Sequence, residues 1–415
     1  MSFVVWSIVA LTTGCVIVRP LRLPEAVWAV TGAALLVGFG LLPLDAAWRG
    51  VARGTDVYLF LVGMMLLAEI ARLEGLFDWL AARAARLARG SAGRLFDLIY
   101  LVGILVTVFL SNDATAVVLT PAVAAVARAV RAEQPLPYLF VCAFIANAAS
   151  FVLPISNPAN LVIYGSHMPP LLEWVPRYAL PSLLSIGATY LVLRLCFRRA
   201  LRQEIAHDVP PARLGPGGRL AALGILATGA VLMLCSGLDL QLGLPTALAG
   251  LATATFVLIL ARQTPWRLLR GISWTVLPLV AGLFVLVEAL ARTGAIAALA
   301  DLVRDRAEAN AADTAWQLGT VLGFACNLFN NLPAGLIAGT AVQAAQAPPA
   351  VTGAVLIGID LGPNLSVTGS LATILWLGVL RRDGYRVSFW AFLQIGLLTM
   401  PPALVLALGA LLTTG

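Results

Sequence analysis

Apolar segments alternate with short polar segments along almost the entire chain of 415 residues. Most of them reach the roughly 20 residues that an α-helix needs to cross a bilayer. We place six of them at 3–18, 25–43, 55–71, 95–130, 136–165 and 177–196, and six more at 219–237, 243–262, 271–293, 314–346, 350–380 and 388–412. This pattern predicts an all-α polytopic membrane protein, because a lipid-exposed helix satisfies its own backbone polar groups.

Polar residues and helix breakers interrupt four of these segments at what would be membrane depth. The breaks lie at 111–113, 154–160, 330–333 and 360–373, the last within "DLGPNLSVTGSLAT". Lipid cannot satisfy the backbone groups that a broken helix exposes, so such breaks are tolerated where they face water or a bound solute. The alternative is that the polar residues only hold helices together, which explains one break more easily than four at equivalent positions.

Matching spacings in the two halves of the chain indicate an internal duplication. Glu69 and Glu288 each precede a glycine by six residues, and 43 residues after each glutamate stands an asparagine beside a break, Asn112 or Asn331. The stretch "NAASFVLPISNPANLV" that begins at residue 147 also aligns with "DLGPNLSVTGSLATIL" that begins at residue 360. We interpret these matches as two copies of one transmembrane unit.

The duplication predicts three regions. They are an N-terminal transmembrane repeat at 1–197, a cytoplasmic linker at 198–218 and a C-terminal repeat at 219–415. With about five crossings and one re-entrant hairpin in each repeat, the second repeat is inverted relative to the first, and the hairpins and broken helices meet near the midplane. Two amphipathic segments, at 76–90 and 296–309, are expected to lie along opposite membrane surfaces.

Arginine placement gives an independent test of this topology. With the linker in the cytoplasm, 21 of the 27 basic residues fall inside and 6 fall outside, as the positive-inside rule requires. We therefore predict a multi-pass protein of the bacterial inner membrane, with its linker in the cytoplasm and both ends outside.

The composition excludes several other classes of protein. The chain is 60% hydrophobic and only 11% charged, which is typical of a protein whose solvent is the bilayer. All 27 basic residues are arginines, so the phosphate-binding loop of ATPases is absent, and two histidines cannot form an HExxH zinc site. We expect no cofactor, no metal site and no nucleic-acid partner, and we attribute the net charge of +7 to the loops.

Four acidic residues remain at membrane depth. An ionised side chain there costs roughly 2.5–3.5 kcal/mol on insertion scales, so such residues usually face a cavity and carry function. Glu69 and Glu288 each lie near a helix end and close to an arginine, and we interpret them as interfacial ion pairs. Asp113 and Asp360 lie inside polar breaks instead, and we interpret them as functional.

The breaks supply the candidate site residues. Amide and hydroxyl side chains there are predicted to contact a solute: Asn112, Asn157, Asn160, Asn330, Asn331, Ser370 and Thr373. Prolines and glycines are predicted to shape the breaks: Pro154, Pro158, Pro333, Gly362, Pro363 and Gly369. Asp113 and Asp360 are the predicted proton-coupling groups, because burial disfavours an ionised carboxylate and both could then exchange protons near neutral pH.

Three motifs resemble the arsenite/antimonite efflux permeases of the ion transporter superfamily. They are "FLSNDATAVVLTP", "FNNLPAGLIAG" and above all "DLGPNLSVTGSLATILWL". The residues that carry the resemblance are Asn112, Asp113, Asn331, Asp360, Gly362, Pro363, Gly369 and Ser370. The resemblance implies a secondary carrier that exports trivalent metalloid hydroxides, driven by proton entry, and in some members a soluble ATPase subunit as partner. One departure is that Asn364 stands where many relatives have lysine.

The predicted solute fits these side chains. Arsenous acid is neutral at physiological pH and presents three hydroxyl groups, which amides and hydroxyls can bind without net charge. A neutral solute does not respond to the membrane potential, so active export needs a coupled ion. Protons carried by the two aspartates would fill this role, with the proton gradient as the energy source.

Two other transport functions and one enzymatic function remain as alternatives. A sodium/proton antiporter of the same superfamily would also use carboxylates and the carbonyls of broken helices. A dicarboxylate carrier should place cationic or hydroxyl-rich groups in the breaks, which contain no arginine. An intramembrane enzyme would need a Ser/His pair, an HExxH motif or paired catalytic aspartates, whose usual local motifs are missing.

Overall fold

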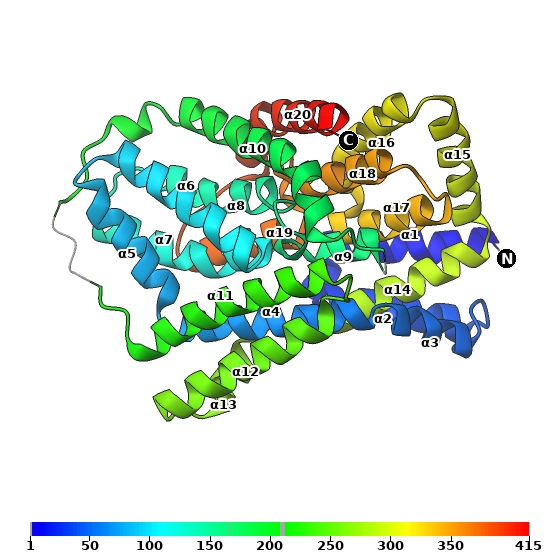
Figure 1. Ribbon diagram of the computed structural model, residues 1–415, viewed down its shortest axis with the longest axis horizontal. Coiled ribbons are helices and arrows are strands. Elements are labelled where there is room, and N and C mark those ends of the chain that lie inside the picture. The colour runs from blue at the N-terminus through cyan, green and yellow to red at the C-terminus, as the bar shows by residue number, and fades with distance from the viewer. Residues whose placement is uncertain (1, 166, 208–211, 415) are drawn as a thin grey trace.

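The computed structural model describes residues 2–165, 167–207 and 212–414, and this part of the chain contains helices and no β-strand (Figure 1). The helices of the first half are α1 (Ser2–Val18), α2 (Glu25–Gly38), α3 (Leu44–Arg53), α4 (Thr55–Leu73), α5 (Leu76–Ala88), α6 (Ala92–Phe109), the π-helix η2 (Ala114–Leu119), α7 (Thr120–Ala129), α8 (Leu136–Ala148), α9 (Pro158–Tyr164) and α10 (Leu171–Cys196). Those of the second half are α11 (Pro216–Gly237), α12 (Gly243–Ala261), α13 (Pro265–Gly271), α14 (Val276–Arg292), α15 (Ala295–Ala309), α16 (Ala311–Phe329), α17 (Asn331–Ala344), α18 (Pro349–Leu361), α19 (Leu371–Arg382) and α20 (Phe389–Thr414).

These bounds confirm the all-α fold and the interrupted segments. Among the described residues, five helices are long and apolar enough to cross a membrane, and a sixth span forms if the bent pair of α13 and α14 is counted as one. The segments predicted at 95–130 and 314–346 are broken before η2 and between α16 and α17. The other two breaks contain short 3₁₀ turns, η3 (Pro154–Ser156) in one and η5 (Gly362–Asn364) and η6 (Val367–Gly369) in the other.

Two helices were not predicted from the sequence. α3 follows Pro43 and carries Asp45 and two arginines, so its composition does not mark a span. α13 lies at 41° to α14 across a short break, and for this reason the span predicted at 271–293 begins only at Val276. Short helices that turn the chain between longer ones are set by packing, and hydropathy over a window of about 20 residues does not detect them.

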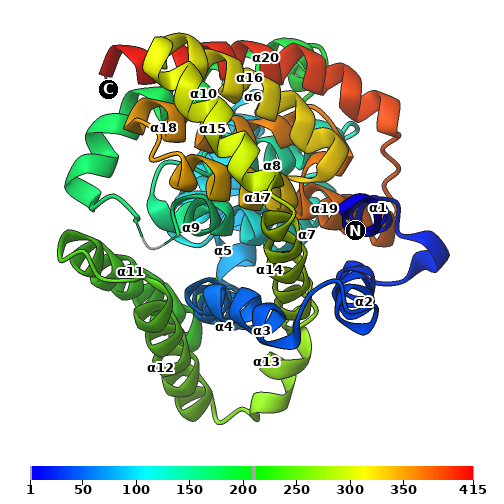
Figure 2. The same cartoon turned by 90° about the vertical axis from the view of Figure 1, so that its right-hand side faces the viewer.

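The helices pack into two groups (Figures 1 and 2). α1–α4 pack with α11–α14, and we call these helices the scaffold group. α6–α10, including η2, pack with α16–α20, and we call these the core group. The amphipathic helices α5 and α15 contact both groups, because α5 touches α4 and α6 while α15 touches α14 and α16.

Equivalent helices of the two halves exchange partners in this packing. In the scaffold group α4 packs against α12, and its counterpart α14 packs against α2. In the core group α6 packs on α8 as α16 packs on α18, and α10 lies against α20. Such reciprocal contacts are what two copies of one unit produce when they fold on each other. The duplication itself and the inverted direction of the second repeat both stay predictions.

The first part of the predicted linker lies against the first half of the chain. The backbone N–H of Ala206 donates to Val130 O at 2.8 Å, and the side-chain oxygen of Gln203 accepts from the backbone of Glu133 at 2.8 Å. Residues 208–211 of the linker lie outside the described residues. α11 begins at Pro216, two residues before the predicted linker end at 218, because proline is well suited to the first turn of a helix.

The predicted topology places the linker and the C-terminal end of the chain on opposite sides of the membrane. Single cysteines introduced as Arg213→Cys and Thr413→Cys, both at exposed positions, should react with a membrane-impermeant thiol reagent from opposite sides. We expect the first to react only in everted vesicles and the second only in intact spheroplasts. Labelling of both from the same side would contradict the inverted arrangement.

Candidate functional site

Side chains at the four breaks cap the helices that follow them. The side-chain oxygen of Asn157 accepts from the backbone N–H of Ala159 at 3.0 Å and so caps α9. Ser370 Oγ accepts from Thr373 N at 3.1 Å at the start of α19, and Ser111 Oγ accepts from Ala114 N at 3.2 Å at the start of η2. Capping satisfies N–H groups that a helix start otherwise leaves unbonded. The same polar residues that interrupt the spans therefore also begin the next helices.

The break before α17 has a second unusual feature. Asn330 adopts a φ of +67°, a conformation that residues other than glycine rarely adopt and that asparagine tolerates best. Its side-chain oxygen accepts from Leu332 N at 3.4 Å, and its amide nitrogen donates to Thr368 O at 3.3 Å. Asn330 thus ties this break to the break that precedes α19.

All four breaks meet at one narrow cleft of about 20 Å³ between the core and scaffold groups. The core group contributes the polar side chains that line it: Asn112, Asp113, Asn157, Asn331 and Ser370. The scaffold group contributes an apolar wall: Val57, Leu61, Val276 and Val280. Because η2, α9, α17 and α19 all begin near this cleft, the partial positive charges of helix N-termini gather around it.

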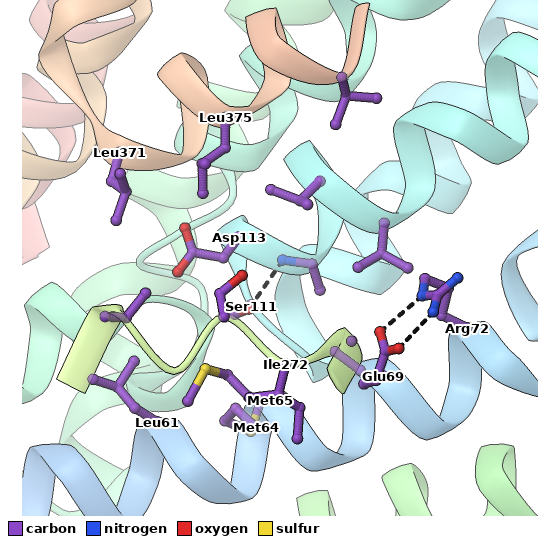
Figure 3. Close-up of a pocket in the computed structure, with 18 of the residues that line it drawn as sticks. Leu61, Met64, Met65, Glu69, Arg72, Ser111, Asp113, Ile272, Leu371 and Leu375 are labelled. Atoms are coloured by element: carbon purple, nitrogen blue, oxygen red, sulfur yellow. Dashed lines mark hydrogen bonds and ion pairs between the residues drawn. The ribbon is translucent and has the colours of Figure 1, made fainter. Parts of the chain in front are cut away.

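A larger cavity of about 370 Å³ adjoins the cleft, and we call it the apolar chamber (Figure 3). The two cavities share Leu61, Asp113 and Leu371 among their lining residues. Aliphatic and methionine side chains of α4, η2 and α19 form much of the wall, and the ion pair of Glu69 with Arg72 lies along α4 beyond them. Polar groups are added by Ser111, Ser273, Arg382 and Asp383.

Asp113 lies where the two cavities join. In Figure 3 its carboxylate projects into the chamber, between Leu371 and Leu375 on one side and Ser111 on the other. Within the described residues no hydrogen bond or ion pair reaches this carboxylate, although the side chain is partly buried. It stands at the start of the π-helix η2, a helix type that is frequent at functional sites. Asp113 is therefore free to bind a solute hydroxyl or a proton.

Asp360 lies outside the cleft, and its predicted role as a proton-coupling group stays a prediction. It lies in the last turn of α18, is fully buried and lines neither cavity. Its Oδ1 accepts a hydrogen bond from Asn157 Nδ2 at 2.8 Å, while Oδ2 lies buried without a geometrically good hydrogen bond, near the Ser150 hydroxyl. Asn157, which lines the cleft, stands between the Asp360 carboxylate and the cleft.

Three other predicted solute ligands do not line the cleft either. Asn160 is fully buried, and its amide nitrogen donates to the backbone carbonyls of Ser150 and Leu153. The Thr373 hydroxyl forms a hydrogen bond with Ser370 Oγ at 2.8 Å. The Asn330 side chain accepts from Leu332 N and donates to Thr368 O. These side chains hold the turns together, since buried backbone carbonyls need donors.

The predicted helix breakers do shape the turns. Pro158 is the first residue of α9, Pro154 begins η3, and Pro333 lies in the first turn of α17. A Cβ atom at Gly362 would overlap the carbonyl of Gly323 and the Cys326 thiol. Gly369 and Pro363 touch so closely that a Cβ on the glycine would likewise overlap the proline backbone. Close backbone approach therefore requires glycine at both positions.

The sequence analysis missed two buried amide contacts near the site. Asn147 Nδ2 donates to Asn364 Oδ1 at 3.0 Å, and Asn364 Nδ2 donates to Phe144 O at 3.1 Å. Asn364, the position that differs from many relatives, thus contacts an asparagine of the other half. Asn327, one turn before the break at 330, accepts from the Ser366 hydroxyl at 2.8 Å and donates to Gly362 O at 3.0 Å. Its only sequence signal is an amide in an apolar helix close to a break.

The prediction that the two glutamates form ion pairs is confirmed. Glu69 is bound by both Arg72 Nε at 2.7 Å and Arg72 Nη2 at 2.5 Å. Glu288 is bound by Arg292 at 3.4 Å and also by Arg53 of the first half at 2.7 Å, a partner that sequence spacing did not indicate. Each buried glutamate is thereby neutralised within the scaffold group.

Comparisons with known proteins match this architecture. Residues 5–359 match the family model described as CitMHS, citrate transporter. The chain is 27% identical over 427 residues to an arsenical pump membrane protein of Escherichia coli, covering 98% of this chain and 97% of that protein. An arsenical pump membrane protein of Yersinia enterocolitica is also 27% identical, over 422 residues with the same coverage. The resemblance inferred from the motifs is confirmed at this level, and these relatives are membrane transporters rather than enzymes.

Two solved structures share the fold. The YdaH transporter of Alcanivorax borkumensis aligns with a TM-score of 0.54 and 16% identity, covering 89% of this chain and 86% of that chain. MtrF of Neisseria gonorrhoeae, described as one of a class of antimetabolite efflux pumps, aligns with a TM-score of 0.51 and 12% identity, covering 89% of this chain and 83% of that chain. At these identities the likeness concerns the fold alone.

Proposed function

This chain belongs to the CitMHS family of membrane transporters, and on that premise we propose that it is a secondary active carrier that exports trivalent metalloid hydroxides, arsenite and antimonite, in exchange for protons. The observation that carries the proposal is the cleft where all four breaks meet. It offers amide and hydroxyl groups and one carboxylate without a hydrogen bond in the described part of the chain. Similarity to arsenical pump membrane proteins over 98% of the chain adds support.

The available bonding groups suit a neutral polyhydroxyl solute. The Asn331 side chain makes no hydrogen bond to another described residue, and Asn112 uses only its oxygen. Asn157 has one amide N–H left after its bond to Asp360. Amide N–H groups donate to solute oxygens, and the Asp113 carboxylate accepts from a solute hydroxyl. In this proposal, binding a proton removes the acceptor at Asp113, so protons and solute compete there.

Citrate is a second candidate because the family description names it. Helix N-termini around the cleft would favour carboxylate groups. However, no basic side chain is among the cleft-lining residues that the structure describes, and Asp113 would repel a multiply charged anion. Electrostatics at the cleft therefore favour the neutral solute over citrate.

We further propose that the carrier works in the bacterial inner membrane with the linker in the cytoplasm. The driving force in this proposal is the proton gradient, and the chain itself contributes no nucleotide site, since it lacks lysine. A soluble arsenite-stimulated ATPase is a further proposed partner, suggested by the family resemblance.

Metalloid accumulation in everted membrane vesicles tests the function directly. With an imposed pH gradient, acid inside, wild-type vesicles should take up arsenite and antimonite against their concentration gradients, and a protonophore should abolish this. Excess citrate should leave uptake unchanged. Sodium-driven proton release without metalloid uptake would instead favour the sodium/proton antiporter.

Removal of the cleft amides should weaken solute binding. Asn112→Leu and Asn331→Leu are each expected to raise the concentration for half-maximal metalloid uptake by roughly tenfold, since one lost hydrogen bond to a polar solute removes about 1–2 kcal/mol. Gln263→Leu, an exposed amide at the end of α12, serves as the control and should behave as wild type. Unchanged half-maximal concentrations in both cleft variants would remove the cleft from the transport path.

A further inference from the structure

The apolar chamber next to the cleft is far larger than the proposed solute requires. Its volume is about 370 Å³ in a cavity that is partly open, whereas arsenous acid has four non-hydrogen atoms. Four water-sized groups occupy roughly 120 Å³ at the volume of liquid water. The chamber lies within the range of roughly 300–1,000 Å³ that is typical of sites for organic ligands.

The cleft, by contrast, is too small to hold the whole solute. Its volume of about 20 Å³ has room for about one water-sized group. A solute that places one hydroxyl among Asn112, Asn157 and Asn331 must therefore extend past Asp113. The shared lining residues Leu61, Asp113 and Leu371 show that the chamber is where it extends.

One part of the chamber wall is unsuited to further hydroxyl groups. Met65 of α4, Val118 of η2 and Leu375 of α19 line it with apolar side chains, as Figure 3 shows for Met65 and Leu375. The polar lining lies elsewhere: Ser111 beside Asp113, the paired charges of Glu69 and Arg72, and Ser273, Arg382 and Asp383. A solute hydroxyl against the apolar part would lack a partner, which is unfavourable, whereas an apolar group there is removed from water.

We infer that the substrates include trivalent metalloids that carry one apolar substituent, with their hydroxyls at Asp113 and the cleft and the substituent in the apolar chamber. A phenyl-substituted trivalent arsenic dihydroxide has this form. The inference rests on the proposed metalloid export and extends it from inorganic to organic substrates. It also explains why a polar cleft is continued by a wall of methionine and aliphatic side chains, since these adapt to substituents of different shape.

Competition in everted vesicles tests the inference. Phenylarsonous acid should halve arsenite uptake by the wild type at a concentration at least roughly tenfold below that at which unlabelled arsenite does so, because burial of apolar groups is worth 10-fold or more. Met65→Trp, which fills the chamber, should abolish this advantage, so that phenylarsonous acid and unlabelled arsenite halve uptake at concentrations within roughly twofold of each other. Met233→Trp, at an exposed position on α11, is the matched control and should keep the advantage.

A second variant guards against loss of folding in Met65→Trp. Leu375→Ser makes the chamber wall polar without filling it and should reduce the phenyl advantage to the same extent. Equal competition by the two compounds in the wild type, or an advantage that survives both variants, would overturn the inference while arsenite uptake still supported the proposed function. Wild-type vesicles that fail to take up arsenite at all would refute the proposed function itself.

Discussion

The Asp113→Asn variant is expected to fold as the wild type does and to lose gradient-driven metalloid accumulation completely. The substitution keeps the size of the side chain, and no hydrogen bond or ion pair of the carboxylate is lost among the described residues. What it removes is the one ionisable group that lines both the cleft and the chamber. A neutral solute cannot be driven uphill without a coupled ion, so export should fall to background while downhill exchange persists.

This result is measured as arsenite uptake into everted vesicles with and without a pH gradient. Asp301→Asn is the control, because Asp301 is an exposed acid that pairs with Arg304 on the same helix. Uphill pumping by Asp113→Asn, with no ATPase present, would contradict the assignment. The coupling group would then have to be sought first at Asp360 and next at Glu69 and Glu288.

The Asn157→Leu variant is expected to show the largest loss of stability in the core group. Asn157 caps α9 and donates a hydrogen bond to Asp360 Oδ1. The other oxygen of the same carboxylate, Oδ2, already lacks a good hydrogen bond. Loss of the cap costs about 1 kcal/mol. Leaving the buried Asp360 acceptor unbonded costs about 1–3 kcal/mol more. Together these contributions should lower the free energy of unfolding by about 2–4 kcal/mol. The loss should be seen as a thermal unfolding transition at a lower temperature in detergent.

A double-mutant cycle separates the hydrogen bond from the cap. Asp360→Leu combined with Asn157→Leu should be clearly less destabilised than the sum of the single variants, because the second substitution removes the group that was left unbonded. Asp360→Asn should stay close to wild type, since its side-chain carbonyl can accept the same bond. Additive effects in the cycle would contradict a direct role of Asp360 in positioning Asn157.

The sequence alone determined most of the helical elements and the places where they break. Length and apolar content decide which segments can cross a bilayer, and this is why the predicted spans at 3–18 and 243–262 nearly coincide with α1 and α12. Proline, glycine and asparagine affect the backbone conformation at their own positions. The sequence therefore also predicts the four breaks. The same local reasoning identified the ion pair of Glu69 with Arg72, which are three residues apart on one helix.

Only the tertiary structure decided which break residues face the cleft. Asn157 and Asn160 are three residues apart, yet one lines the cleft and the other bonds to buried carbonyls, because the direction of each side chain depends on how the turn packs. In the sequence, Asp113 and Asp360 are both acids in polar breaks, and nothing there tells which of them faces the cleft. The structure decides this, because Asn157 lies between Asp360 and the cleft. The apolar wall from α4 and α14 likewise depends on packing between distant segments. Long-range contacts of this kind leave no local pattern in a single sequence.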